Sequence, residues 1–170
     1  TMSDWIETPP ENRISKDAQI ESLDNIVISG YVTINRNVKI SLDSPTPSSS
    51  SPILSIGKYC YIYPDVEITP STEKMFIGSY VIIGSSSKIM AKDIGNRVII
   101  EDNCVVHPHC VIYDCCLIKS GTIIPNKVVI PPYSKVSGTP GVDFTIQPLH
   151  NSYKKSIELE AKQLQILNPS

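Results

Sequence analysis

Aromatic residues and long apolar runs are both scarce in this chain. Only 6% of the 170 residues are Phe, Trp or Tyr, whereas 41% are hydrophobic, so aliphatic side chains must fill the interior. No stretch approaches the roughly 20 apolar residues that span a bilayer. No basic and then apolar leader opens the sequence either. These absences predict a cytoplasmic protein with no direct membrane insertion.

A charge excess of either sign is also missing. The 15 basic and 17 acidic residues are mixed along the chain and leave a net charge of -2. Such a balance creates no broad field that attracts nucleic acid or an anionic surface, so no nucleic-acid partner is expected. Five cysteines, an odd number, argue against a disulfide framework and indicate reduced thiols. The length suits one domain.

What the sequence does contain is a period of six residues. In the second half, an aliphatic residue stands at every sixth position without a miss. These residues, called anchors below, are Ile94, Ile100, Val106, Ile112, Ile118, Ile124, Ile130 and Val136. Three earlier blocks repeat the spacing: Ile28, Ile34 and Ile40; Ile56, Ile62 and Ile68; Ile77, Ile83 and Ile89. Neither a helix nor a hairpin meander produces this spacing, which predicts a short strand and a bend in every repeat, with anchors stacked from coil to coil.

The residues two positions before the anchors are mostly small, and four of them are Cys60, Cys104, Cys110 and Cys116. Side chains two apart on a strand share one side, so these thiols are predicted to be small apolar fillers of the core. The short C-x2-C pairs of zinc ribbons are missing. Cys115, next to an inward cysteine, is expected to face outward.

Glycine directly follows four of the anchors, at Gly57, Gly78, Gly84 and Gly95, where a Cβ could obstruct the chain. This pairing resembles the hexapeptide-repeat superfamily, over roughly residues 14 to 140. The resemblance implies an all-β solenoid, a left-handed parallel β-helix of triangular section. With three repeats to a coil, the chain would make between five and six coils, followed by one C-terminal α-helix.

The repeat pattern also predicts the boundaries of the segments. Residues 1-13 are expected to be an N-terminal cap segment, and residues 14-140 the β-helix. A Ser- and Pro-rich insertion at 41-52 contains no anchors and reads as a loop, and Thr69 to Lys74 forms a shorter excursion. Residues 141-170 form a C-terminal segment. Within it, apolar spacing from Tyr153 to Leu164 predicts a helix at about 152-167 that covers a flank of the solenoid.

Three histidines are the candidates for chemistry. The γ-class carbonic anhydrases share the solenoid and bind zinc through three histidines, two of them five residues apart. Here His107, His109 and His150 are separated by two and 41 residues, so no metal site is predicted. The stretch from Ile130 to Gly141 resembles the closing coil of hexapeptide acyltransferases, which use an acyl-coenzyme A donor and a histidine base. An acyltransferase is therefore the alternative function, although no acidic residue at a revealing spacing would orient His107 or His109.

A more specific resemblance covers the opening segments, the first coil and the whole second half of the chain. The opening segments Asp4 to Thr8 and Asn12 to Ser15, the first coil from Asn25 to Gly30, and Asp114-Cys115-Cys116 are similar to the dynactin subunit 5 family. So are Val129-Ile-Pro-Pro132 and Ser137 to Gly141. The turn expected after the first coil is replaced by Ser41-Leu42-Asp43 and the Ser/Pro loop.

This resemblance implies a non-catalytic structural subunit of the dynactin pointed-end complex, which supports attachment of dynein and dynactin to endosomal cargo along microtubules. The implied partners are proteins: the sister subunit dynactin subunit 6, the pointed-end actin-related protein with an associated dynactin subunit, and dynein cargo adaptors. No cofactor is implied. In the last coil, Pro131, Pro132 and Tyr133 form an outward apolar patch that is expected to receive another subunit.

Overall fold

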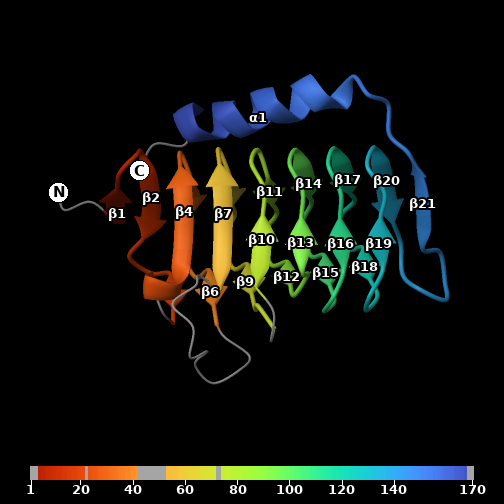
Figure 1. The fold of residues 1–170 in the computed structure, drawn as a ribbon, viewed down its shortest axis with the longest axis horizontal. Coiled ribbons are helices and arrows are strands. Elements are labelled where there is room, and N and C mark those ends of the chain that lie inside the picture. The colour runs from red at the N-terminus through yellow and green to blue at the C-terminus, as the bar shows by residue number, and fades with distance from the viewer. Residues whose placement is uncertain (1–3, 22, 42–52, 72–73, 168–170) are drawn as a thin grey trace.

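The chain winds into a prism of three parallel sheets with one helix laid along it (Figure 1). The computed structural model describes residues 4-21, 23-41, 53-71 and 74-167. Each coil contributes one strand to each sheet, and six coils are completed before the last two strands of the largest sheet. The predicted all-β solenoid with a C-terminal helix is therefore confirmed. No helix in the described residues is long and apolar enough to cross a membrane.

We call the three sheets A, B and C. Sheet A contains, in spatial order, β1 (Trp5–Thr8), β2 (Asn12–Ser15), β5 (Thr33–Ile34), β8 (Tyr61–Ile62), β11 (Ile82–Ile83), β14 (Val98–Ile100), β17 (Cys116–Ile118), β20 (Ser134–Ser137) and β21 (Thr145–Pro148). Sheet B contains β3 (Gln19–Ile20), β6 (Lys39–Ile40), β9 (Glu67–Ile68), β12 (Lys88–Ile89), β15 (Val105–Val106) and β18 (Ile123–Ile124). Sheet C contains β4 (Ile26–Gly30), β7 (Leu54–Lys58), β10 (Met75–Ile77), β13 (Asp93–Ile94), β16 (Val111–Ile112) and β19 (Val129–Ile130). A short 3-10 turn, Leu23–Asn25, precedes β4.

The anchors stack in register, as the six-residue period predicts. In sheet C, for example, Ile56 pairs with Ile77, Ile77 with Ile94 and Ile94 with Ile112. From Ile34 onward, every anchor is at most 3% exposed. Their side chains form one continuous aliphatic core, in which each coil depends on its neighbours for burial.

Glycine follows an anchor because successive coils approach closely at that point. A Cβ on Gly78 would lie 2.7 Å from the carbonyl carbon of Gly95 and 2.5 Å from Oδ1 of Asn96. The same Asn96 oxygen accepts a hydrogen bond of 2.8 Å from the backbone N–H of Ser79. Glycine therefore leaves room for a polar side chain of the next coil to satisfy a backbone donor at the edge of the turn.

The bends themselves are made by other residues. Left-handed φ angles recur at non-glycine residues of each corner of the prism. At the corner between sheets C and A, called the first corner, these residues are Tyr31, Tyr59, Tyr80, Arg97, Cys115 and Tyr133. At the corner between sheets A and B they are Asn37, Asp65, Ser86 and Asn103, and between B and C they include His109 and Lys127. The backbone strain of these left-handed φ angles persists because the stacked core fixes the position of each corner.

Helix α1 (Tyr153–Leu167) runs back along the prism from its C-terminal end toward its N-terminal end (Figure 1). Ile157 and Ala161 are 1% and 0% exposed, and the helix packs against β8 of sheet A. The outward side chains of Tyr61 and Ile82 on this sheet are buried as well. The helix thus covers a flank of the solenoid, as its amphipathic spacing predicts.

The two ends of the prism are closed differently. At the C-terminal end, β21 pairs antiparallel with β20, and Phe144 packs against the core, so that Ile130 is 0% exposed. At the N-terminal end, β1 pairs antiparallel with β2 and covers the edge of sheet A only. Of the predicted cap segment, strand β1 therefore covers one side of this end. A single hairpin strand reaches one side of a triangle and leaves the other two open.

Some predicted features fall in part outside the described residues. The Ser/Pro loop predicted at 41-52 lies there except for Ser41, and the excursion from Thr69 to Lys74 includes residues 72 and 73. The first coil begins with β2 at Asn12, so the solenoid takes in residues that sequence reasoning placed in the cap segment.

Candidate functional site

The predicted partner patch lies in the last coil, where its backbone is firmly held. Pro131, Pro132 and Tyr133 are all exposed, and Tyr133 has a φ of 56° at the end of the first corner. Its N–H donates to the carbonyl of Asp114 at 3.1 Å, and its own carbonyl accepts from the N–H of Leu149 at 2.8 Å. Two backbone hydrogen bonds therefore hold this tyrosine in place while 37% of its surface stays exposed.

Two further apolar side chains lie in or directly after strands of sheet C that lead into this patch. Tyr113, directly after β16, is 51% exposed, and Val129 of β19 is 56% exposed. β19 is also the last strand of sheet C, so one of its edges faces away from the sheet. Sequence reasoning named only Pro131, Pro132 and Tyr133; the stacking of sheet C adds the other two. Rigid aromatic and proline surface of this kind suits contact with another protein.

A second feature is the ladder of aromatic rings at the first corner. Tyr31 stacks on Tyr59 with 4.6 Å between ring centroids, and Tyr59 stacks on Tyr80 at 5.5 Å. The ammonium of Lys162 on helix α1 lies 5.7 Å from the centroids of both Tyr59 and Tyr80. Arg97 continues the ladder at 5.3 Å from Tyr80, and its guanidinium pairs with Glu158 of the helix. The rings stack because successive coils each place one tyrosine at this corner, and cations of the helix and of the next coil lie over them.

Cys115 occupies the next position of this corner, and the sequence prediction that it faces outward needs a correction. It does point away from the core, but it is only 2% exposed. Burial raises the pKa of its thiol, while the charges of Arg97 and Lys154 oppose the rise. Helix α1 carries Lys154 and runs along this corner, so a tertiary contact removes the exposure that strand alternation alone predicts.

The other cysteines point into the prism, as predicted, and they also make hydrogen bonds. The thiols of Cys60, Cys104 and Cys110 donate to the carbonyls of Gly78, Lys119 and Pro125, at 3.1, 3.1 and 2.9 Å. Burial raises the pKa of Cys60 to about 12 and that of Cys104 to about 11. A protonated, buried thiol is a poor nucleophile and a poor metal ligand, so these cysteines serve the core.

The three histidines do not come together as a site. His109 is exposed at a corner of the prism and His107 is half-buried two residues earlier. Neither imidazole has a hydrogen-bond or ion-pair partner among the described residues, whereas the Nδ1 of His150 lies 2.8 Å from the hydroxyl of Ser152. The described part of the chain also contains no cluster of His, Cys, Asp and Glu side chains arranged to hold a metal ion.

A shallow groove lies beside the helix, between sheet A and the neighbouring corner. Its volume is about 210 Å³, and its lining includes Glu101, Asp102 and Glu160 together with Tyr63 and Ser120. Three carboxylates would repel the phosphate groups of coenzyme A. Among the described residues, only Glu101 of these acids forms an ion pair with a lysine, Lys119, at 3.3 Å. The groove is therefore a poor place for an acyl-coenzyme A donor.

Comparison with known protein families identifies the family to which this solenoid belongs. A family model described as Dynactin subunit 5 matches residues 1–155. This chain belongs to the dynactin subunit 5 family. The matched range contains the solenoid, the Pro131 to Tyr133 patch and the start of helix α1. A comparison of this dynactin subunit 5 family member with curated proteins finds no match.

Solved structures with the same fold are hexapeptide-repeat proteins. A hexapeptide transferase family protein from Anaplasma phagocytophilum is 18% identical with a TM-score of 0.60; the alignment covers 92% of this chain and 90% of that one. Perosamine N-acetyltransferase from Caulobacter crescentus, solved with CoA and GDP-perosamine, is 15% identical with a TM-score of 0.61; the alignment covers 81% of this chain and 56% of the transferase. At these identities the likeness shows the fold alone, which is the left-handed parallel β-helix of hexapeptide repeats.

The arrangement of the histidines leads to an expected result for ligand binding. We expect the purified protein to bind neither zinc nor acetyl-coenzyme A, because its histidines are scattered and the groove beside α1 is acidic. Elemental analysis after dialysis should find zinc well below one equivalent, and calorimetry should show no saturable heat with acetyl-coenzyme A. Stoichiometric zinc, or a saturable coenzyme A isotherm that is lost in His107→Ala or His109→Ala, would favour the enzyme alternative.

Proposed function

We propose that this protein is a non-catalytic structural subunit of the dynactin pointed-end complex, which supports the attachment of dynein and dynactin to endosomal cargo along microtubules. The observation that carries the proposal is the family match over residues 1–155. On this proposal the protein acts in the cytoplasm, as part of a cytoskeletal motor complex. It needs no cofactor for that role.

The shape of the molecule suits a scaffold. Three parallel sheets share one aliphatic core, and every coil is bonded to the coils beside it. A stack of this kind offers no hinge about which a cleft could open and close. Outward side chains recur at a fixed spacing along each sheet, so binding surfaces on the prism keep fixed positions relative to one another. That rigidity supports holding several protein partners in one arrangement.

We place the contact with the sister hexapeptide-repeat subunit, dynactin subunit 6, on the patch of Pro131, Pro132 and Tyr133. A tyrosine held by two backbone hydrogen bonds loses little conformational entropy on binding, and the neighbouring prolines lose little as well. The pointed-end actin-related protein with its associated dynactin subunit, and the dynein cargo adaptors, would meet other faces of the prism. This assignment of the patch is a proposal about the last coil.

Co-expression with the sister subunit tests both the partner and the patch. We expect a one-to-one heterodimer by size-exclusion chromatography with light scattering. Tyr133→Ala should lower the affinity between the two subunits by about 30-fold, because a central aromatic side chain contributes about 2 kcal/mol to binding. The matched control is Phe76→Ala, which removes another exposed aromatic side chain, 49% exposed, from the middle of sheet C.

Two outcomes would contradict this proposal in different ways. If Tyr133→Ala and Phe76→Ala both bind the sister subunit like the wild type, the complex forms but the patch is elsewhere. If the two proteins elute separately at micromolar concentration while this chain alone forms a threefold trimer, the acyltransferase alternative gains over the scaffold.

A further inference from the structure

The N-terminal end of the prism leaves part of its core open. In the first coil Ile20, Ile26 and Ile28 are only partly buried, although they point toward the same core as the later anchors. At the opposite end Ile124 and Ile130 are 0% exposed. The described residues leave apolar surface open at this end, whereas the chain itself closes the other end. Such a surface indicates that something else covers it.

Strand β1 supplies one side of a further coil, and two sides are missing. Ile6 of β1 pairs directly with Ile14, so both side chains lie on the core side of sheet A. Ile6 is nevertheless 45% exposed, because no strand of the described part of the chain continues sheets B and C beside it. β3 and β4 are the terminal strands of those sheets and, within the described residues, are paired with a neighbouring strand on one side only.

The missing sides form a recess. It has a volume of about 400 Å³, and its apolar lining comes from all three sides of the prism: Ile6, Ile20, Leu23, Ile26 and Ile28. Leu23, in the turn before β4, is 56% exposed. An apolar recess bordered by two open strand edges is suited to a partner that adds strands and places aliphatic side chains inside.

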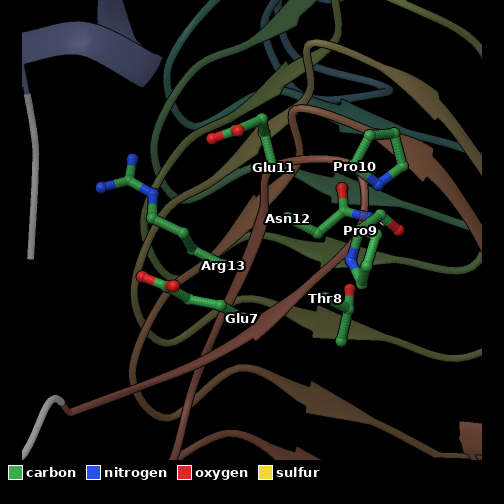
Figure 2. Close-up of a pocket in the computed structure, with 7 residues that line it drawn as sticks. All are labelled: Glu7, Thr8, Pro9, Pro10, Glu11, Asn12 and Arg13. Atoms are coloured by element: carbon green, nitrogen blue, oxygen red, sulfur yellow. Dashed lines mark hydrogen bonds between the residues drawn. The ribbon is translucent and has the colours of Figure 1, made fainter.

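The rim of this end is acidic. Residues 4 to 25 contain six acidic residues against two basic ones, Arg13 and Lys16. All six are exposed: Asp4, Glu7, Glu11, Asp17, Glu21 and Asp24. Figure 2 shows Glu7 and Glu11 on the same side of the β1–β2 hairpin as Arg13, with Pro9 and Pro10 on the other side. The lining of the recess itself contains one charged residue, Lys16, and the acidic residues lie around it on the same end of the prism. Their excess of negative charge favours a partner that carries lysine or arginine outside its apolar residues.

We propose that this open end binds a segment of a partner protein that forms two short strands, carries aliphatic side chains six residues apart and is flanked by basic residues. The two strands would extend β3 and β4 and complete the coil that β1 begins. The aliphatic side chains would fill the recess against Ile6, Ile26 and Ile28. The inference goes beyond the proposed contact at Tyr133, because it concerns the opposite end of the prism.

A second copy of this chain fits the recess poorly. At the C-terminal end, sheet A extends through β20 and β21 beyond the last strands of sheets B and C. At the N-terminal end it is again sheet A that extends, through β1. Stacked head to tail, two copies would meet at sheet A first and leave sheets B and C apart. A partner that supplies only the two missing strands has the complementary shape.

The chain itself contains a suitable probe for this surface. Residues 119-131 form β18 and β19, carry the anchors Ile124 and Ile130 six residues apart, and include Lys119 and Lys127 with no acidic residue. A fluorescein-labelled peptide of this sequence should bind the full-length protein saturably, as followed by anisotropy. The affinity should fall as salt is raised, since part of the attraction is between charges. The same peptide with Ile124→Asp and Ile130→Asp should not bind.

Variants of the protein locate the binding. Leu23→Lys should lower the affinity for the peptide by about 10-fold or more, because it removes apolar contact and adds a charge that repels the lysines of the peptide. Leu23 is exposed, so the fold does not need its side chain. Val142→Lys is the matched control, since Val142 is an aliphatic residue, 82% exposed, near the other end. Hydrogen exchange with the peptide bound should slow at residues 19-28, where strands would be added.

Three results would overturn the proposal. One is no saturable binding of the peptide to the wild-type protein at millimolar concentration. Another is peptide binding that does not map to this end of the prism. It would be seen as equal affinity of the wild type and Leu23→Lys, or as slowed hydrogen exchange elsewhere than residues 19-28. The third is a concentration-dependent dimer of the protein alone that Leu23→Lys abolishes, which would assign the open end to a second copy. None of these depends on whether the sister subunit binds at Tyr133.

Discussion

Replacing Ile112 by aspartate is expected to unfold the protein. Ile112 is 1% exposed and stacks between Ile94 and Ile130 in sheet C, so the carboxylate would be buried with no basic partner. Losing the apolar side chain and burying an unpaired charge together cost about 5 kcal/mol or more. That is comparable to the whole stability of an ordinary domain. Circular dichroism should show loss of the strand signal, and the protein should become insoluble or lose its cooperative thermal transition.

A neighbouring strand of the same sheet provides the control for this substitution. Val129→Asp places the same carboxylate on the outward face of β19, at a side chain that is 56% exposed. Its effect on the free energy of unfolding should stay within about 1 kcal/mol. Ile112→Val should cost about 1 kcal/mol, since it removes one buried methylene group. A soluble Ile112→Asp protein with a cooperative transition near that of Val129→Asp would show that the anchors are not the core.

Detaching helix α1 is expected to make Cys115 reactive. Ile157 is 1% exposed between the helix and the prism, and replacing it by aspartate removes about 2 kcal/mol of apolar burial. The detached state should then be populated about 30-fold more often, and the rate at which a disulfide reagent labels Cys115 should rise by a similar factor. The core thiols should stay slow, because they lie inside the prism and burial keeps them protonated.

Leu159→Asp is the matched control for the helix, since Leu159 lies on the same helix and is 57% exposed. It should leave the labelling rate close to that of the wild type. Cys115→Ser in the Ile157→Asp background should remove the fast phase and so identify the thiol. Equal labelling of wild type and Ile157→Asp would mean that the helix does not protect this corner.

Most of the interior could be predicted from the sequence. Anchors six residues apart define which side chains point inward, and the small residues two positions before them share that side. Both rules are local and repeat in every coil, so the positions of Ile112 and Cys104 follow from spacing alone. The repeat also predicts that glycine is needed directly after some of the anchors. The contact that requires them lies between coils, however, where Asn96 reaches across Gly78.

The candidate site could be predicted less well. Pro131, Pro132 and Tyr133 are exposed in the last coil, as their place in the repeat predicts. That Tyr113 and Val129 lead into the same patch depends on which strands become neighbours in sheet C. The hydrogen bond from Leu149 that holds Tyr133 comes from a segment with no repeat of its own, and no spacing rule places it.

By itself, then, the sequence determined the solenoid, its core and the presence of one C-terminal helix, because a period of six residues can bury its anchors only by stacking. The tertiary structure alone decided what covers the outside. Helix α1 buries Cys115, which alternation places on the surface, and β1 closes one side of the N-terminal end and leaves Ile20, Ile26 and Ile28 partly open. Both outcomes depend on where a distant segment docks, and docking is set by the shape and free energy of the assembled surface rather than by local spacing.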